Sequence, residues 1–208
     1  MVRKLVAILG ASALLFSSSG CRIRSEKGAN GEDKSVQIDT PFGGVHVNTN
    51  DTTAADLGLP LYPGAELDRD DDKHQSADVH MGFGEWQLRV RVAPYLSTDS
   101  QDKIVAFYKK SMGRFGDVLT CRGNAPVGTP TVTAEGLDCS DSGKKTHINI
   151  DGKANGMDDY SGDLQLKAGS KRHQHIVALG DLPSGKTRFA LIAIDLPAGI
   201  DGKSDKSD

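Results

Sequence analysis

The sequence predicts an α+β domain in which a mostly antiparallel β-sheet carries one main amphipathic helix packed on one face. Residues 97–116 are the only stretch with a clear helical period. Around them the chain breaks into short β-branched or alternating runs separated by polar turns. Successive runs are joined by short turns, which favours antiparallel pairing over parallel crossovers.

A helix is expected over residues 101–115. Its apolar side chains recur at steps of three and four and form one stripe: Ile104, Phe107, Tyr108, Met112 and Phe115. Thr98 and Gln101 have the spacing of a capping box, and Gly116 can take the left-handed conformation that ends a helix. A single helix of about four turns is only marginally stable in water, so the stripe needs a covering sheet.

Alternation of apolar and polar side chains predicts a half-buried strand at residues 85–93, with residues 77–82 as its hairpin partner. A second hairpin is expected between residues 36–38 and 45–47. The remaining predicted strands are 118–121 with a partner within 129–137, then 147–150, 164–168, 173–179 and 188–195. The leucine-containing segment 56–66 is expected to pack over the core as an ordered loop, and the acidic run 68–78 to be a solvated turn.

The chain begins with the pattern of an export signal. Arg3 and Lys4 precede an apolar run of twelve residues, which is too short to span a membrane comfortably, and small residues follow. Ser19, Gly20 and Cys21 resemble the end of the lipobox of bacterial lipoprotein precursors. This resemblance implies cleavage before Cys21 and acylation of Cys21, although Ser18 stands where the first lipobox position usually has Leu. The open alternative is an ordinary secretory signal that leaves Cys21 unpaired.

Residues 1–20 are therefore expected to be a lipoprotein signal peptide. Arg22 stands where an inner-membrane retention signal usually has Asp, which favours the outer membrane as the location. Residues 21–34 are polar and glycine-containing and are expected to form a flexible tether. A single α+β domain is expected over residues 35–197, followed by a polar tail at 198–208.

Charge and cysteine content restrict the function further. Residues 1–20 hold two basic and no acidic side chains, so their removal changes the net charge from −3 to −5. An acidic chain of this kind is not expected to bind nucleic acid, for which a basic surface is typical. With Cys21 assigned to lipid, Cys121 and Cys139 remain, and in an exported protein such a pair is expected to form a disulfide.

Several short motifs together resemble a set of uncharacterised bacterial lipoproteins. These are LPLYPGAE at residues 59–66, TPFGGVHV at 40–47, SQDKIVAFYKK at 100–110, and the segments KRHQHIVALG and KTRFALIAIDL near the end of the chain. The resemblance spans most of the mature chain. It implies the architecture of an exported lipoprotein domain, and it implies no activity and no functional residues.

The segment GDLPSGKT at residues 180–187 matches a phosphate-binding loop pattern. Such a loop needs a helix that begins at its Lys-Thr, because the helix amides hold the phosphates. The residues that follow are short, β-branched and end in a proline. We therefore interpret the segment as a hairpin turn and predict no nucleotide site and no cofactor.

His173 and His175 are two residues apart, so in a strand they point to the same face. With His147 from another strand they form a secondary candidate metal site, whereas the main interpretation is ordinary surface histidines and no metal. We find no nucleophile elbow and no paired carboxylates that indicate a catalytic site.

The expectation from sequence is thus a non-enzymatic, lipid-anchored envelope protein of unknown specific activity, acting as a binding or structural module. Its expected partners are the membrane, through Cys21, and an unidentified protein or small-molecule ligand. The alternative is a small periplasmic hydrolase or metal-dependent enzyme whose site is assembled from distant residues. A concave pocket lined by acids and histidines would favour that alternative.

Overall fold

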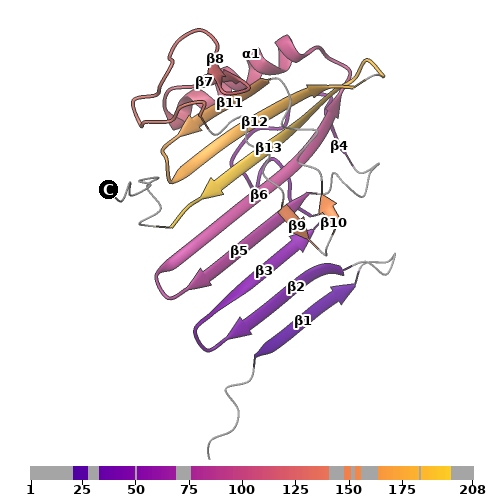
Figure 1. Cartoon of the computed structure of the whole chain (residues 1–208). Coiled ribbons are helices and arrows are strands. Elements are labelled where there is room, and N and C mark those ends of the chain that lie inside the picture. Colours follow the sequence, from indigo (N-terminus) through magenta and orange to yellow (C-terminus); the bar gives the residue numbers. More distant parts are fainter. Residues whose placement is uncertain are drawn as a thin grey trace, which may run out of the picture.

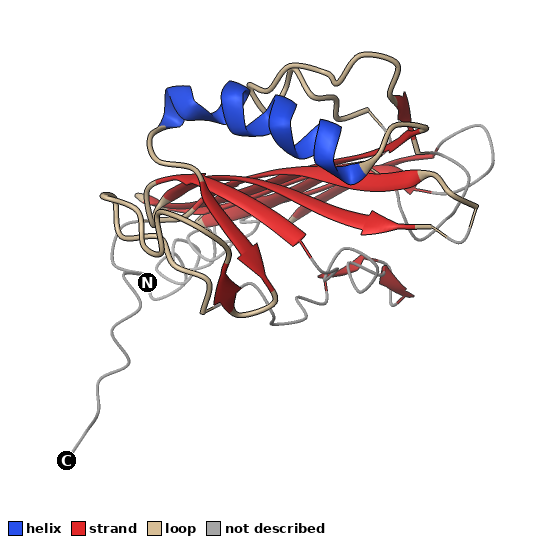
Figure 2. Ribbon diagram, turned by 90° about the horizontal axis from the view of Figure 1, so that it is seen from above, coloured by secondary structure: helices blue, strands red, loops and turns tan. Residues whose placement is uncertain are grey.

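The computed structural model describes residues 21–27, 33–49, 51–68, 76–140, 148–150, 153–155, 164–182 and 184–197. Helix α1 (Gln101–Met112) lies on one face of a large antiparallel sheet (Figures 1 and 2). The expected α+β class, mostly β, is confirmed. The expected leader at 1–20 and tail at 198–208 lie outside the described residues.

The main sheet follows the order β1-β2-β3-β5-β6-β13-β12-β11-β7-β8, with β4 added beside β6. Its strands are β1 (Arg22–Lys27), β2 (Asp33–Thr40), β3 (Gly43–Thr49), β4 (Glu66–Leu67), β5 (Ala77–Phe83), β6 (Trp86–Ser97), β7 (Leu119–Arg122), β8 (Ala125–Pro126), β11 (Leu164–Gly169), β12 (His173–Asp181) and β13 (Thr187–Asp195). Strands β9 (Ile148–Ile150) and β10 (Lys153–Asn155) pair separately. The three predicted hairpins, β2–β3, β5–β6 and β12–β13, are all present.

Helix α1 buries the predicted stripe. Ile104, Tyr108 and Met112 are fully buried, while Phe107 and Phe115 pack against the same core from its margin. The helix ends at Met112, and a short 3-10 turn, Gly113–Phe115, carries the chain to Gly116, whose φ of 118° requires glycine. The predicted capping box is wrong, because Ser100 is the N-cap and makes no side-chain capping bond.

The core is centred on Phe189 in β13. Its ring contacts Tyr95 of β6, Tyr108 of α1 and Tyr62 of the 51–68 segment, with centroids 5.6, 5.8 and 6.3 Å away. Each tyrosine hydroxyl is used at the edge of the core: Tyr108 donates to the Pro60 carbonyl, Tyr62 donates to Asp99, and Tyr95 accepts from the Ala54 amide. Burial raises the pKa of all three hydroxyls, so they stay protonated.

The ordered loop predicted at 56–66 is confirmed, since Leu57, Leu59 and Tyr62 are buried in this core. Asp68, by contrast, is not part of a solvated turn. It is buried and forms a 2.8 Å ion pair with Arg188 of β13. Residues 69–75 of the acidic run lie outside the described residues.

Two local predictions need correction. Residues 22–27, expected to belong to a flexible tether, form strand β1, because their backbone completes a ladder with β2 even though every side chain is exposed. Residues 129–137, expected to pair with β7, form turns around Pro130. The neighbours of β7 are instead β8 and β11.

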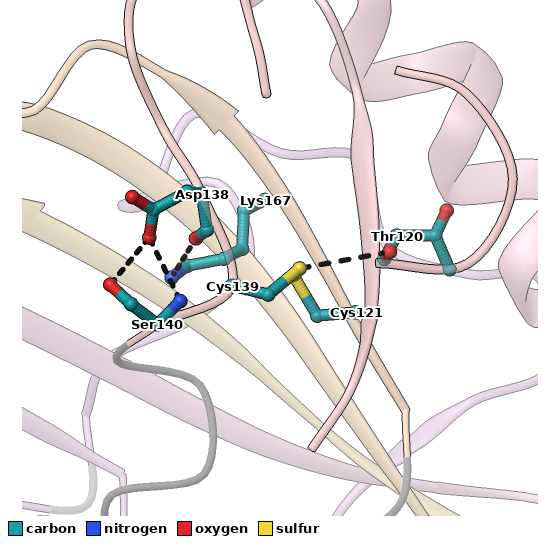
Figure 3. The surroundings of a disulfide bond; sticks show 6 residues. All are labelled: Thr120, Cys121, Asp138, Cys139, Ser140 and Lys167. Atoms are coloured by element: carbon teal, nitrogen blue, oxygen red, sulfur yellow. Dashed lines mark hydrogen bonds between the residues drawn. A yellow bond between two sulfur atoms is a disulfide. The ribbon is translucent and has the colours of Figure 1, made fainter. Parts of the chain in front are cut away.

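The disulfide predicted between Cys121 and Cys139 is present, with the two Cα atoms 5.6 Å apart (Figure 3). Cys121 lies in β7, and Cys139 lies in the connection that follows Leu137. Beside the bond, the Lys167 ammonium donates to the Asp138 carbonyl at 3.1 Å. A crosslink over 18 residues contributes about 3 kcal/mol to folding stability. It attaches a segment without strands to the edge of the sheet.

The two faces of the sheet differ beyond the helix. Strands β2, β3, β5 and β6 direct valine, isoleucine, leucine and methionine to the face opposite α1, where a small cluster formed by Ala178, Ala190 and Ile192 is buried. The same strands direct polar side chains to the α1 side. In the described part of the chain, no helix combines the length and apolar character needed to cross a membrane.

Replacing Phe189 by Ala is expected to lower the free energy of unfolding by about 3–5 kcal/mol, because it leaves a cavity that three tyrosines and α1 share. Urea unfolding followed by circular dichroism measures the change. Phe42→Ala is the matched control: its ring is 84% exposed, so the same substitution should change stability by less than about 0.5 kcal/mol. Equal losses in the two variants would contradict the assignment of Phe189 as the centre of the core.

Candidate functional site

A row of polar side chains crosses the sheet on the α1 side, beyond the end of the helix. We call it the polar strip. It consists of Gln37 and Asp39 (β2), His46 (β3), Asp78 and His80 (β5), Gln87, Arg89 and Arg91 (β6), Asp195 (β13) and His173 (β12). These residues share a face because side chains alternate along each strand and the register aligns neighbouring strands. The helix covers β11 and β12 and leaves most of the strip open (Figure 1).

Most charges in the strip are paired. Arg89 forms a bidentate pair with Asp78, with N–O distances of 2.9 and 2.6 Å. His46 lies 3.0 Å from Asp39, and this hydrogen bond is the main reason that the pKa of Asp39 is lowered. The rings of His46 and His80 meet edge to face at 6.2 Å. Pairing of this kind holds donors and acceptors in fixed positions on an open surface.

The most enclosed part of the strip lies beneath the 51–68 segment, and Asp195 is its centre. One carboxylate oxygen accepts from Arg91 at 2.9 Å, and the other lies 2.9 Å from His173 Nδ1. Burial pushes the pKa of Asp195 up, but the His173 hydrogen bond and the charge of Arg91 together hold it below its usual value. Arg91 also donates to the backbone carbonyl of Asp56, which ties this loop to the sheet.

His175 lies beside this group, stacked on Phe115 with ring centroids 3.7 Å apart. Burial lowers the pKa of the ring, partly offset by a hydrogen bond to the backbone of Leu57, so the ring is neutral near pH 7. Its Nδ1 atom and the Nε atom of Arg91 are both buried without a hydrogen-bond partner among the described residues. A buried acceptor and a buried donor in one neighbourhood are the groups that an ordered water or small polar ligand satisfies.

The structure places His173 and His175 on one face, as predicted, but gives them different roles. His173 is bound to Asp195, while His175 is enclosed by Phe115 and Leu57. His147, the third member of the secondary metal hypothesis, lies outside the described residues. Within the described ranges no three His, Cys, Asp or Glu side chains are grouped so that they could hold a metal ion.

The His173–Asp195 pair is the arrangement in which a carboxylate orients a histidine base. Hydrolysis by this pair would also need a nucleophile at the other ring nitrogen. The Ser170 hydroxyl oxygen accepts from the backbone amide of His173 at 3.2 Å, and this contact does not involve the imidazole ring. Asp195 lies in β13 and His173 begins β12, so their contact joins these two neighbouring strands.

A hollow of about 460 Å³ lies elsewhere, at the C-terminal end of α1. Gly58, Leu59, Pro60, Ser111 and Arg114 line it, and none of these residues is an acid or a histidine. The segment 180–187 is a hairpin turn as predicted: Gly185 has a φ of 77°, Leu182 and Lys186 are joined by a backbone hydrogen bond, and strand β13 begins at Thr187.

Sequence reasoning missed most of the polar strip. The alternation at residues 85–93 did indicate that Arg89 and Arg91 share one face, but it could not assign their partners. Asp78 is 11 residues from Arg89, and Asp195 is 104 residues from Arg91. Only the register of the assembled sheet brings these groups together.

The neutral, buried state of His175 predicts a pH-dependent stability. Below pH 6.5 the unfolded chain binds a proton that the folded ring resists, so stability should fall as pH drops through this region. Between about pH 7.5 and pH 5.5, wild type should lose stability more steeply than His175→Gln, by at most about 1.4 kcal/mol per pH unit. Urea unfolding at each pH measures this.

Asp195 acts in a lower window, because its folded pKa lies below 3.8 and its contribution is lost only in stronger acid. His80→Gln, at an exposed position bonded to Gln87, is the matched control and should follow wild type. If His175→Gln shows the same pH slope as wild type, His175 does not carry the effect.

Comparison with known proteins does not assign the chain to a family. No protein-family model matches it, and neither a curated protein nor a solved structure shows significant similarity to it.

Proposed function

We propose that this chain is an exported bacterial envelope protein, anchored by lipid on Cys21, that acts as a non-enzymatic binding module. The leader, the small residues before Cys21 and the short motifs described above also support a resemblance to uncharacterised bacterial lipoproteins. The observation that carries the proposal is the division of the three cysteines. Cys121 and Cys139 are joined, whereas Cys21 is free and exposed at the start of β1.

A structural disulfide is typical of exported proteins, since cytosolic reductants keep thiols reduced. An exposed cysteine directly after an export-type leader is in the position where acylation occurs. Stable attachment to a bilayer needs more than one acyl chain, which lipoprotein processing at this position would supply. The outer membrane is the favoured location because Arg22 follows the cysteine.

The polar strip supports the binding role. It is a row of paired charges, imidazoles and amides on the face of the sheet that also carries α1 and the main core. Such a surface suits a polar partner, a protein or a small molecule, that exchanges hydrogen bonds with fixed groups. The His173–Asp195 pair is the specific observation that favours the alternative, a small hydrolase, and measurable ester hydrolysis that His173→Ala abolishes would support it.

Acylation is tested on the intact chain expressed in a bacterium with its own leader. Mass spectrometry of the N-terminal peptide should show diacylglycerol on Cys21 and no residue before it. Cys21→Ser should lose the lipid and move from the detergent phase to the aqueous phase on phase separation. A mature chain that begins elsewhere, or a Cys21 without lipid, would refute the anchor.

The binding role is tested by crosslinking in intact envelopes. We expect one or more partners to be captured by wild type and lost, by about tenfold, in a His46→Ala/His80→Ala variant, because these half-buried rings are central to the strip. Lys109→Ala/Lys110→Ala, on the exposed side of α1, is the control and should capture normally. Partners that persist in the histidine variant would show that the strip is not the binding surface.

A further inference from the structure

One end of the sheet combines the start of β1 with the turns of two hairpins. Arg22 pairs with Asp39, so Cys21 lies beside the β2–β3 turn at residues 41–42. Gly43 pairs with Phe83, and Phe83 with Trp86, which brings the β5–β6 turn to the same end. Figure 1 shows this end at the lower left, where the chain enters β1 and both turns project from the sheet.

Large apolar side chains gather at this end. Phe42 is 84% exposed, Ile23 is 67% exposed and Phe83 is 50% exposed, and Phe83 lies against Trp86 with ring centroids 6.0 Å apart. They are three of the six exposed large apolar side chains among the described residues. We call Ile23, Phe42, Phe83 and Trp86 the aromatic tip. None of these four side chains belongs to the buried clusters of the described residues. Their exposure to water is unfavourable, and a partner surface that covered them would remove this cost.

The position of Cys21 identifies the kind of surface. Because residues 22–27 are paired in the sheet rather than forming a tether, no flexible segment lies between Cys21 and the tip. An acyl chain on Cys21 would hold the tip at the bilayer surface. Phenylalanine and tryptophan favour the interface between headgroups and acyl chains, where a ring is partly buried. Arg22 and Arg24, exposed on β1, add cations beside the anchor, with Glu85 as an acid in the β5–β6 turn.

We propose that the aromatic tip is a second membrane contact, which docks this end of the sheet into the surface of the bilayer that holds Cys21. The inference rests on the proposed lipid anchor. Ile23, Phe83 and Trp86 point to the face opposite the polar strip, because they alternate with its residues along the strands. Docking by the tip therefore leaves the polar strip accessible and gives it a defined orientation to the membrane.

Trp86 is the single tryptophan of the chain and reports on the tip directly. The mature acylated chain is reconstituted on vesicles of phosphatidylethanolamine and phosphatidylglycerol. Trp86 emission should shift to the blue, and quenching by aqueous acrylamide should fall about twofold relative to the Cys21→Ser chain in buffer. Lipids brominated near the headgroup should quench Trp86.

Two double variants separate docking from simple anchoring. Ile23→Ser/Phe42→Ser removes exposed side chains of the tip without changing the ring packed on Trp86, and should reduce quenching by brominated lipid at least about twofold. Leu61→Ser/Val132→Ser removes two exposed apolar side chains elsewhere and should behave as wild type. Equal effects of the two double variants would overturn the proposal.

The outcomes distinguish this inference from the lipid anchor itself. If mass spectrometry finds lipid on Cys21 but Trp86 remains as open to acrylamide as in buffer, the anchor stands and the tip proposal fails. If Cys21 carries no lipid, the anchor fails, and the tip is tested by adding excess vesicles to the unacylated chain. A blue shift that depends on Ile23 and Phe42 then supports the tip, and no shift overturns it. Protection of Trp86 that depends on protein concentration without vesicles would assign the tip to self-association and also overturn the proposal.

Discussion

The structure depends on the contact of one phenylalanine ring with three tyrosine rings. Phe189 lies near the start of β13, and its neighbours Tyr62, Tyr95 and Tyr108 come from the 51–68 segment, β6 and α1. Each tyrosine also uses its hydroxyl at the edge of the core, so the apolar contact and the hydrogen bonds reinforce each other. The helix, the long loop and the two central strands therefore form one unit, and neither the helix nor the loop would be stable without it.

This unit allows the N-terminal half of the sheet to extend beyond the core. Among the described residues, no helix packs against strands β1, β2, β3 and β5, and their stability comes from the ladder that begins at β6. Most side chains of β2, β3 and β5 are half-buried on both faces, and β1 forms one edge of the sheet. Polar pairs occupy one face, and aliphatic side chains occupy the other. The first face is suited to polar partners and the second to an apolar environment.

The same geometry connects the proposed lipid anchor to the proposed binding surface. Part of the segment that sequence composition assigned to a tether is a strand, so the distance from Cys21 to the sheet is set by backbone hydrogen bonds rather than by chain length. A protein attached in this way would present its polar strip at a constant height and angle. A flexible linker would instead allow all orientations, and the cost of fixing one of them would reduce the affinity for an envelope partner.

Patterns within about 20 residues determined much of this protein: the stripe of α1, the three hairpins, the turn at 180–187 and the pairing of Cys121 with Cys139 follow from periodicity, turn residues and the cysteine count. The tertiary structure decided the rest. It made residues 22–27 a strand, buried Asp68 against Arg188, and brought Arg91, Asp195 and His173 together from three strands. Local sequence reports which face of an element is apolar, whereas the partners of a charged side chain depend on strand order and register, which are properties of the whole assembled sheet.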